Sequence, residues 1–120
     1  MFQVQSELVK QYAETENCVI IGRCADYVLK DRDNVFSVFI YAPYLDRIAN
    51  SVEKLGIKAS AAKIIVDEVD YARELCYEKF TKTEFNTTNY RDLLINSAIL
   101  GRRKTADLIA GMAKHYFKEQ

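Results

Sequence analysis

One apolar run, residues 35–42 (VFSVFIYA), constrains the fold more than any other part of the chain. It is rich in β-branched and aromatic residues and it stops at Pro43, so it predicts a β-strand. Its apolar character is nearly continuous, which is typical of a strand that is covered on both faces in a parallel sheet. Parallel strands need long crossover connections, which are usually helices. The run therefore predicts an α/β fold.

The other segments fit this fold because helical and strand-like patterns alternate along the chain. Two short apolar runs, residues 18–21 and 93–96, are expected to be strands. Helices are expected over residues 2–15, 44–55, 60–81 and 104–117, with a helical turn over 25–29. The resulting order predicts one domain, residues 1–120, with a parallel sheet of about three strands flanked by helices.

Apolar spacing and end signals define the expected helices. The helix over 44–55 is expected to begin after Pro43 and to end at Gly56, and Ser60 is the expected N-cap of the next helix. In the first helix Val4, Leu8 and Tyr12 recur at spacings of four. The long helix has the clearest seam, which predicts one buried face: Ala61, Ile65, Val69, Ala72, Cys76 and Phe80.

Composition excludes several classes of protein. Basic and acidic residues both number 17, which argues against a nucleic-acid binder with its usual basic excess. No apolar run approaches the roughly 20 residues that span a bilayer, and no signal peptide is evident. The three cysteines form no CxxC pair, so we expect a reduced cytoplasmic protein with buried, inert thiols. His115 is the only histidine, which excludes the common zinc patterns.

Ligands of open parallel sheets bind beyond the carboxyl ends of the strands, so the residues there are candidate site residues. Gly22 and Arg23 follow the first predicted strand. A glycine permits close approach of a ligand, and a guanidinium can hold phosphate with two parallel hydrogen bonds. The alternative is that Arg23 forms an ordinary ion pair with a nearby carboxylate such as Asp26.

Further candidate charges lie on the predicted helices. Asp70 and Arg73 are three residues apart, so they form either a surface ion pair or a joint site for a polar ligand. Arg47 and its neighbour Asp46 have the same two interpretations. The basic cluster 102–104 is more typical of a solvated loop than of a nucleic-acid site.

No glycine-rich phosphate-binding loop occurs in these 120 residues. The chain has four glycines and contains no GxxxxGK[ST], GxGxxG or nucleophile elbow. We therefore assign no residue to catalysis and none to a metal.

Four segments, taken in order, resemble the cytidylate kinase-like family. They are 16–29 with its GRxAD motif, 38–43 followed by Arg47, 70–73 with its DxxR motif, and 89–97 followed by Leu100 and Gly101. The resemblance implies a P-loop nucleoside monophosphate kinase fold, which transfers a phosphoryl group from ATP, with magnesium, to an acceptor such as CMP.

The resemblance also implies roles for individual residues. Arg23, beside Gly22, would hold the acceptor's phosphate. Asp70 and Arg73 would face the acceptor nucleotide from the lid helix, and Arg47 would support the same pocket.

The chain departs from the family pattern because the strand, glycine-rich loop and helix that open the family fold have no counterpart in it. We expect a domain truncated at its N-terminus, inactive alone and binding neither ATP nor magnesium by itself. The missing strand would lie between the first two strands, and exposed strand edges favour self-association or pairing with a partner chain. Two alternatives are a non-catalytic interaction subunit completed by a partner chain and an unrelated small α/β binding domain.

Overall fold

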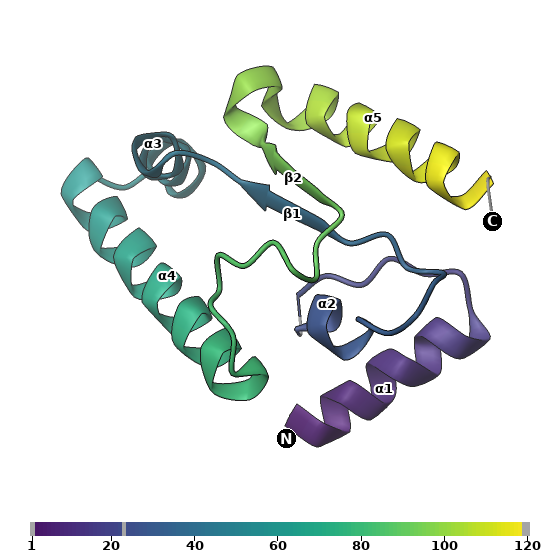
Figure 1. Ribbon diagram of the computed structural model, residues 1–120. Coiled ribbons are helices and arrows are strands. Elements are labelled where there is room, and N and C mark those ends of the chain that lie inside the picture. The colour runs from purple at the N-terminus through teal and green to yellow at the C-terminus, as the bar shows by residue number, and fades with distance from the viewer. Residues whose placement is uncertain (1, 23, 119–120) are drawn as a thin grey trace.

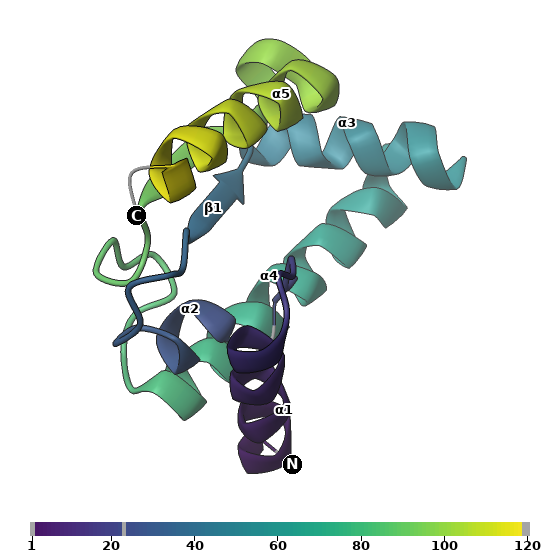
Figure 2. The same cartoon turned by 90° about the vertical axis from the view of Figure 1, so that its right-hand side faces the viewer.

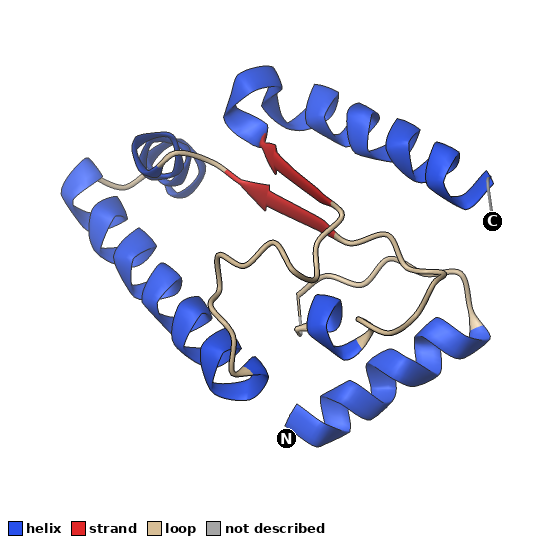
Figure 3. Ribbon diagram, in the orientation of Figure 1, coloured by secondary structure: helices blue, strands red, loops and turns tan. Residues whose placement is uncertain are grey.

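The chain folds around a parallel pair of strands, β1 (Val38–Tyr41) and β2 (Leu93–Asn96), as Figures 1 and 3 show. The computed structural model describes residues 2–22 and 24–118. The register is fixed where the two strands begin. The Asp92 N–H donates to the Ser37 carbonyl at 2.8 Å, and the Ser37 N–H donates to Asp92 Oδ2 at 2.8 Å.

Five helices surround this pair among the described residues: α1 (Phe2–Thr15), α2 (Ala25–Val28), α3 (Tyr44–Leu55), α4 (Ala59–Thr81) and α5 (Ser97–Lys118). Helices α3 and α4 lie on one side of the strands and α5 on the other, while α1 and α2 lie beyond the strands' amino ends (Figures 1 and 2). No helix within residues 2–22 and 24–118 is both long and apolar enough to cross a membrane. The predicted α/β class is confirmed.

Proline and glycine in the sequence predicted the boundaries of α3 correctly, whereas the predicted start of α4 is wrong. Helix α3 begins after Pro43 and ends at Gly56, as predicted. Gly56 adopts a left-handed backbone with φ of 65°, and its N–H donates to the Val52 carbonyl at 2.9 Å. Helix α4 begins at Ala59, so Ser60 lies inside the first turn and the predicted cap is wrong.

The last helix begins earlier than predicted. Helix α5 starts at Ser97, directly after β2, and is broken at Gly101, which has φ of 81° and ψ of 172°. Glycine tolerates a positive φ better than any other residue. The single turn before the break is too short to show a helical period, which is why the sequence pattern indicated only the part after it.

The predicted first strand, residues 18–21, is wrong. No described residue pairs with this segment, and Val19 and Ile21 are 90% and 87% exposed. A strand forms only where a neighbour accepts its backbone hydrogen bonds, and an apolar composition does not provide that neighbour. The sheet therefore has two strands where about three were expected.

The long helix buries a face next to the predicted one. Its buried residues are Ala62, Val66, Tyr77 and Thr81. Ile65, Val69 and Phe80, from the predicted seam, are 38%, 42% and 38% exposed. Both stripes repeat at helical spacing, and the elements that pack on α4 decide which of them is covered.

The Arg91 guanidinium is buried. The Arg91 side chain is 4% exposed, and its Nε donates to Asp26 Oδ2 at 3.2 Å. Its Nη1 donates to the backbone carbonyls of Phe85 at 2.6 Å and Thr87 at 2.9 Å. The guanidinium also lies 3.9 Å from the centre of the Phe39 ring. Arg91 thus joins α2, β1 and the loop that precedes β2.

Helix α4 joins this cluster through Tyr77, whose hydroxyl donates to Asp26 Oδ2 at 3.0 Å. Burial, followed by the Asp26 carboxylate, raises the pKa of Tyr77 far above its ordinary value, so the hydroxyl keeps its proton. Asp26 had been a possible partner for Arg23. The structure pairs it with Arg91, and because Arg23 lies outside the described residues its own pairing stays a prediction.

The described chain exposes more surface than a compact protein of its mass. Its accessible area is 9151 Å² for 13.8 kDa. A compact monomer of this mass exposes about 6,600 Å². Its radius of gyration is 15.9 Å, against about 14 Å for a compact domain of this length. The apolar residues of α1 contribute, since Val4, Leu8 and Tyr12 are 63%, 49% and 53% exposed.

All three cysteines are free thiols, and the expectation that they are buried is wrong for two of them. Cys18 and Cys76 are exposed, while Cys24 is half-buried. Burial, followed by the proximity of Cys76 and Asp26, raises the pKa of Cys24 to about 11.

We predict that iodoacetamide at pH 8 alkylates Cys18 and Cys76 faster than Cys24, because the thiolate is the reactive form. Peptide mass spectrometry over a time course measures the three rates. The Cys24 rate should rise as the pH approaches 11, where its thiolate forms. Equal rates at pH 8 would contradict the prediction.

We predict that Arg91→Met lowers the free energy of unfolding by about 3 kcal/mol, because it leaves the Asp26 carboxylate buried without its cation. Urea unfolding followed by circular dichroism measures the change. Arg103→Met, at an exposed position of α5, is the matched control and should change stability by less than about 0.5 kcal/mol. Equal effects of the two substitutions would show that the cluster is not structural.

Candidate functional site

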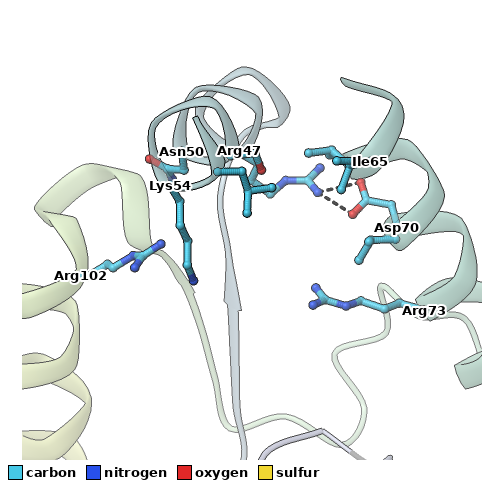
Figure 4. Close-up of a pocket in the computed structure, with 11 residues that line it drawn as sticks. Arg47, Asn50, Lys54, Ile65, Asp70, Arg73 and Arg102 are labelled. Carbon is cyan, nitrogen blue, oxygen red and sulfur yellow. Dashed lines mark hydrogen bonds and ion pairs between the residues drawn. The ribbon is translucent and has the colours of Figure 1, made fainter. Parts of the chain in front are cut away.

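A cleft of about 390 Å³ lies between α3, α4 and α5. Leu55, Ile65, Val66 and Val69 supply much of its apolar wall. Its charged residues come from all three helices: Arg47 and Lys54 from α3, Asp70 and Arg73 from α4, and Arg102 from α5. Four cations and one carboxylate therefore line one space (Figure 4).

Arg47 is held in place by β1 and by α4. Its Nε donates to the Ala42 carbonyl, just after β1, at 3.0 Å. Its Nη1 donates to both carboxylate oxygens of Asp70, at 2.6 and 2.7 Å. The two side chains are 35% and 30% exposed, so the ion pair is only partly screened by water. Figure 4 shows this contact across the top of the cleft.

A second contact ties the same two helices together. The Tyr44 hydroxyl donates to Asp67 Oδ1 at 2.5 Å. This hydrogen bond, more than any other influence, raises the pKa of Tyr44 above its ordinary value. The Arg47 guanidinium lies 5.7 Å from the centre of the Tyr44 ring. Helices α3 and α4 therefore form one wall of the cleft as a unit.

The surface ion pair considered for Asp70 and Arg73 does not form, because Asp70 is bound by Arg47. No hydrogen bond or ion pair joins Arg73 to any residue in the described part of the chain. Its guanidinium points away from Asp70 into the space between α4 and α5 (Figure 4). The structure thus brings Arg47, Asp70 and Arg73 together at one cleft, and their roles toward a nucleotide stay a prediction.

Sequence reasoning missed Arg102 and Lys54. The break at Gly101 places Arg102 at the start of the longer part of α5, where it lines the cleft. Neither Arg102 nor Lys54 has an ion-pair partner among the described residues, and both point into the cleft in Figure 4. The available signal was the position of Arg102, a few residues beyond the carboxyl end of β2.

Gly22 and Asp46 do not line this cleft. Gly22 has a left-handed backbone with φ of 70° and open space around it. Arg23 lies outside the described residues, so its proposed contact with phosphate stays a prediction. Asp46 is exposed on α3.

The donor set of the cleft does not fit a magnesium ion. Magnesium prefers carboxylate oxygens and water, and both oxygens of Asp70, the cleft's carboxylate, already accept from Arg47. Within residues 2–22 and 24–118, no group of three or more His, Cys, Asp or Glu side chains is placed to hold a metal. The cleft is suited to anions.

We predict that Asp70→Ala loosens α3 from α4, because it removes the acceptor of both Arg47 Nη1 bonds. Amide exchange across α3 should quicken about fivefold, the equivalent of about 1 kcal/mol for a partly exposed charged hydrogen bond. Glu68→Ala removes the same charge from an exposed position on α4 and is the control. Unchanged exchange in Asp70→Ala would show that the ion pair does not hold the wall together.

The sequence and the fold are both similar to those of known proteins. Residues 1–99 match the model of the cytidylate kinase-like family. Among solved structures, the fold is similar to the crystal structure of an uncharacterized protein from Eubacterium ventriosum ATCC 27560, with a TM-score of 0.81 and 22% sequence identity. The match covers 95% of this chain and 63% of the Eubacterium ventriosum chain. This chain therefore spans less than two thirds of the length of that protein. A likeness at this identity shows the fold alone. No curated protein matches the chain.

Proposed function

The chain belongs to the cytidylate kinase-like family, and from this premise we propose that it binds a phosphate-bearing nucleotide in the cleft between α3, α4 and α5. We further propose that residues 1–120 alone transfer no phosphoryl group. The observation that supports binding is the charge of the cleft. Asp70 is neutralised by Arg47, whereas Lys54, Arg73 and Arg102 have no anionic partner among the described residues.

Three cations without partners attract a multiply charged anion. Guanidinium groups bind phosphate through parallel hydrogen bonds, and a lysine ammonium adds a point charge. The apolar side chains of Leu55, Ile65 and Val69 offer surface to a base or a ribose. The volume of about 390 Å³ lies within the range of small-molecule sites, about 300–1,000 Å³.

Each residue has a distinct task in this proposal. Arg73 and Arg102 bind phosphate oxygens from opposite sides of the cleft, and Lys54 adds positive charge between them. Arg47 is a positioning residue, because its contacts with Ala42 and Asp70 fix the wall that presents Arg73. The resemblance assigns Arg47, Asp70 and Arg73 to the acceptor nucleotide, and Gly22 and Arg23 to its phosphate.

The absence of phosphoryl transfer follows from what these 120 residues do not contain. Phosphoryl transfer depends on a cradle and on cations that neutralise the moving group. The chain has no GxxxxGK[ST] and only four glycines. For the family reaction, ATP with magnesium would have to be positioned for transfer by a phosphate-binding loop from a segment other than these residues; binding of ATP as an anion without magnesium needs no such loop. A cytoplasmic location belongs to the same proposal and is supported by the free thiols.

We predict that calorimetric titration detects binding of CMP and, more tightly, of ATP, because the triphosphate carries more charge. Both titrations are run without magnesium. Arg73→Ala or Arg102→Ala should weaken ATP binding about tenfold, which corresponds to about 1.4 kcal/mol. Arg103→Ala makes the same charge change at the next position, which does not line the cleft, and should bind like the wild type.

Binding should also weaken as salt is raised, because exposed charges are screened. Equal weakening by Arg103→Ala would assign the effect to overall charge and would count against the cleft. No heat with either nucleotide would overturn the proposal of binding.

We predict that the chain forms no ADP above background when ATP, magnesium and CMP are supplied together. A coupled spectrophotometric assay measures this. Turnover that survives purification and disappears in Arg73→Ala would show that these residues suffice for transfer, against the proposal.

A second candidate function is that of an interaction subunit completed by a partner chain. The observation that favours it is the exposed apolar segment 18–21, which no described strand pairs. Restored CMP phosphorylation upon addition of a separate chain bearing a glycine-rich loop would support this function. The two candidates are compatible, since a completed enzyme would still use the cleft.

A further inference from the structure

Two of the three free thiols, Cys24 and Cys76, lie beside the same contact between α2 and α4. That contact is the hydrogen bond of 3.0 Å from the Tyr77 hydroxyl to Asp26 Oδ2. Cys76 directly precedes Tyr77 on α4, and Cys24 is the N-cap residue of α2, two residues before Asp26. Figures 1 and 2 both show α2 beside the carboxyl-terminal half of α4. The fold therefore brings together two thiols that are 52 residues apart in the sequence.

These two thiols are close enough for the charge of one to affect the other. Burial is the largest cause that raises the pKa of Cys24 to about 11, and the proximity of Cys76 is the next, followed by that of Asp26. Cys18 does not contribute, although it is only six residues from Cys24 in the sequence. Of the other two thiols, Cys76 is therefore the one near Cys24.

The backbone at Cys24 is suited to a local rearrangement. Cys24 has a left-handed conformation with φ of 54°, which is strained for a residue other than glycine. It precedes α2, a helix of only four residues. The Cα atoms of a disulfide lie about 4.4–6.8 Å apart. We expect this strained turn, rather than the long α4, to adjust when a bond between the two sulfur atoms forms.

We propose that Cys24 and Cys76 are a redox-sensitive pair, which forms an intramolecular disulfide with an oxidant of the class of small disulfides, such as oxidised glutathione. Cys76 is exposed and reacts first: its thiolate attacks one sulfur of the oxidant, forms a mixed disulfide and releases one thiolate. The Cys24 thiolate then attacks the Cys76 sulfur and releases the second thiolate. Two electrons pass from the cysteines to the oxidant, and the released thiolates take up the two protons that the cysteines lose.

Two features favour the second step. Burial still raises the pKa of Cys24, but the mixed disulfide carries no charge at Cys76, so the next cause of the raised pKa is removed. Both sulfur atoms also belong to one folded chain, which gives the attack a high effective concentration. Cytoplasmic disulfides are usually transient and redox-sensing, so the proposal agrees with the free thiols of the structure. It goes beyond nucleotide binding and does not depend on it.

Tryptic peptide mapping of the oxidised chain tests the proposal, because the three cysteines fall in separate peptides, 11–23, 24–30 and 74–79. The reduced full chain is treated with oxidised glutathione at pH 8, blocked with N-ethylmaleimide and digested without reductant. Peptides 24–30 and 74–79 should be joined at about ten times the level of any other pair. The intact chain should lose two hydrogens and keep the mass of a monomer, and dithiothreitol should reverse the change.

Cys18→Ser is the matched control and should form the same disulfide as the wild type. In Cys76→Ser the remaining thiols should carry only glutathione. Unfolding the wild type in urea should abolish the preference, because Cys18 and Cys24 then close a much shorter loop than Cys24 and Cys76. Far-UV circular dichroism checks that both variants fold.

Several results of the wild-type experiment would overturn the proposal without reference to any variant. Glutathione adducts as the only products would show that the two thiols do not meet in the folded chain. A bond from Cys18, or a bond between two chains, as the main product would show that Cys24 and Cys76 are not the reactive pair. A preference for Cys24 and Cys76 that persists in urea would show that the fold does not cause it.

Discussion

The arrangement of this fold depends on a buried cation, the Arg91 guanidinium. It pairs with Asp26 of α2, lies over Phe39 of β1 and binds the loop before β2, while Tyr77 of α4 shares the same carboxylate. Removing these charges from water costs several kcal/mol, which is offset only because each polar group has a partner. Fully buried apolar side chains are few in the described chain. The polar cluster therefore fixes relative positions that a larger apolar core would otherwise fix.

The cleft is a consequence of that fixed position. Helix α4 is held near its carboxyl end by Tyr77, and its middle is tied to α3 through the Arg47–Asp70 ion pair. With α4 held in two places, Arg73 stays directed at α5 and Arg102. Neither Arg73 nor Arg102 has an anionic partner among the described residues. Positive charge that the protein itself does not neutralise is the argument for an anionic ligand.

Elements set by local chemistry could be predicted from the sequence. Pro43 and Gly56 bound α3 because proline and glycine act on their own backbone, and β2 follows from its apolar run. Features that depend on a partner distant in the sequence could not be predicted from the sequence. Residues 18–21 have the composition of a strand but no neighbour, and the buried stripe of α4 was chosen by what packs on it. Arg102 was missed for the same reason, since a basic cluster does not reveal which helix it will face.

The open sheet edge and the cleft are connected through one residue, Ala42. It follows β1 directly, and its carbonyl holds the Arg47 guanidinium that binds Asp70. A strand added at the outer edge of β1 would restrict the backbone that leads to Ala42, and so would restrict the wall of the cleft. Coupling between two binding events is reciprocal, so an anion that orders Arg47 would favour strand addition by the same free energy. Completion of the sheet by another strand and binding of an anion in the cleft would therefore be linked through Ala42 and Arg47.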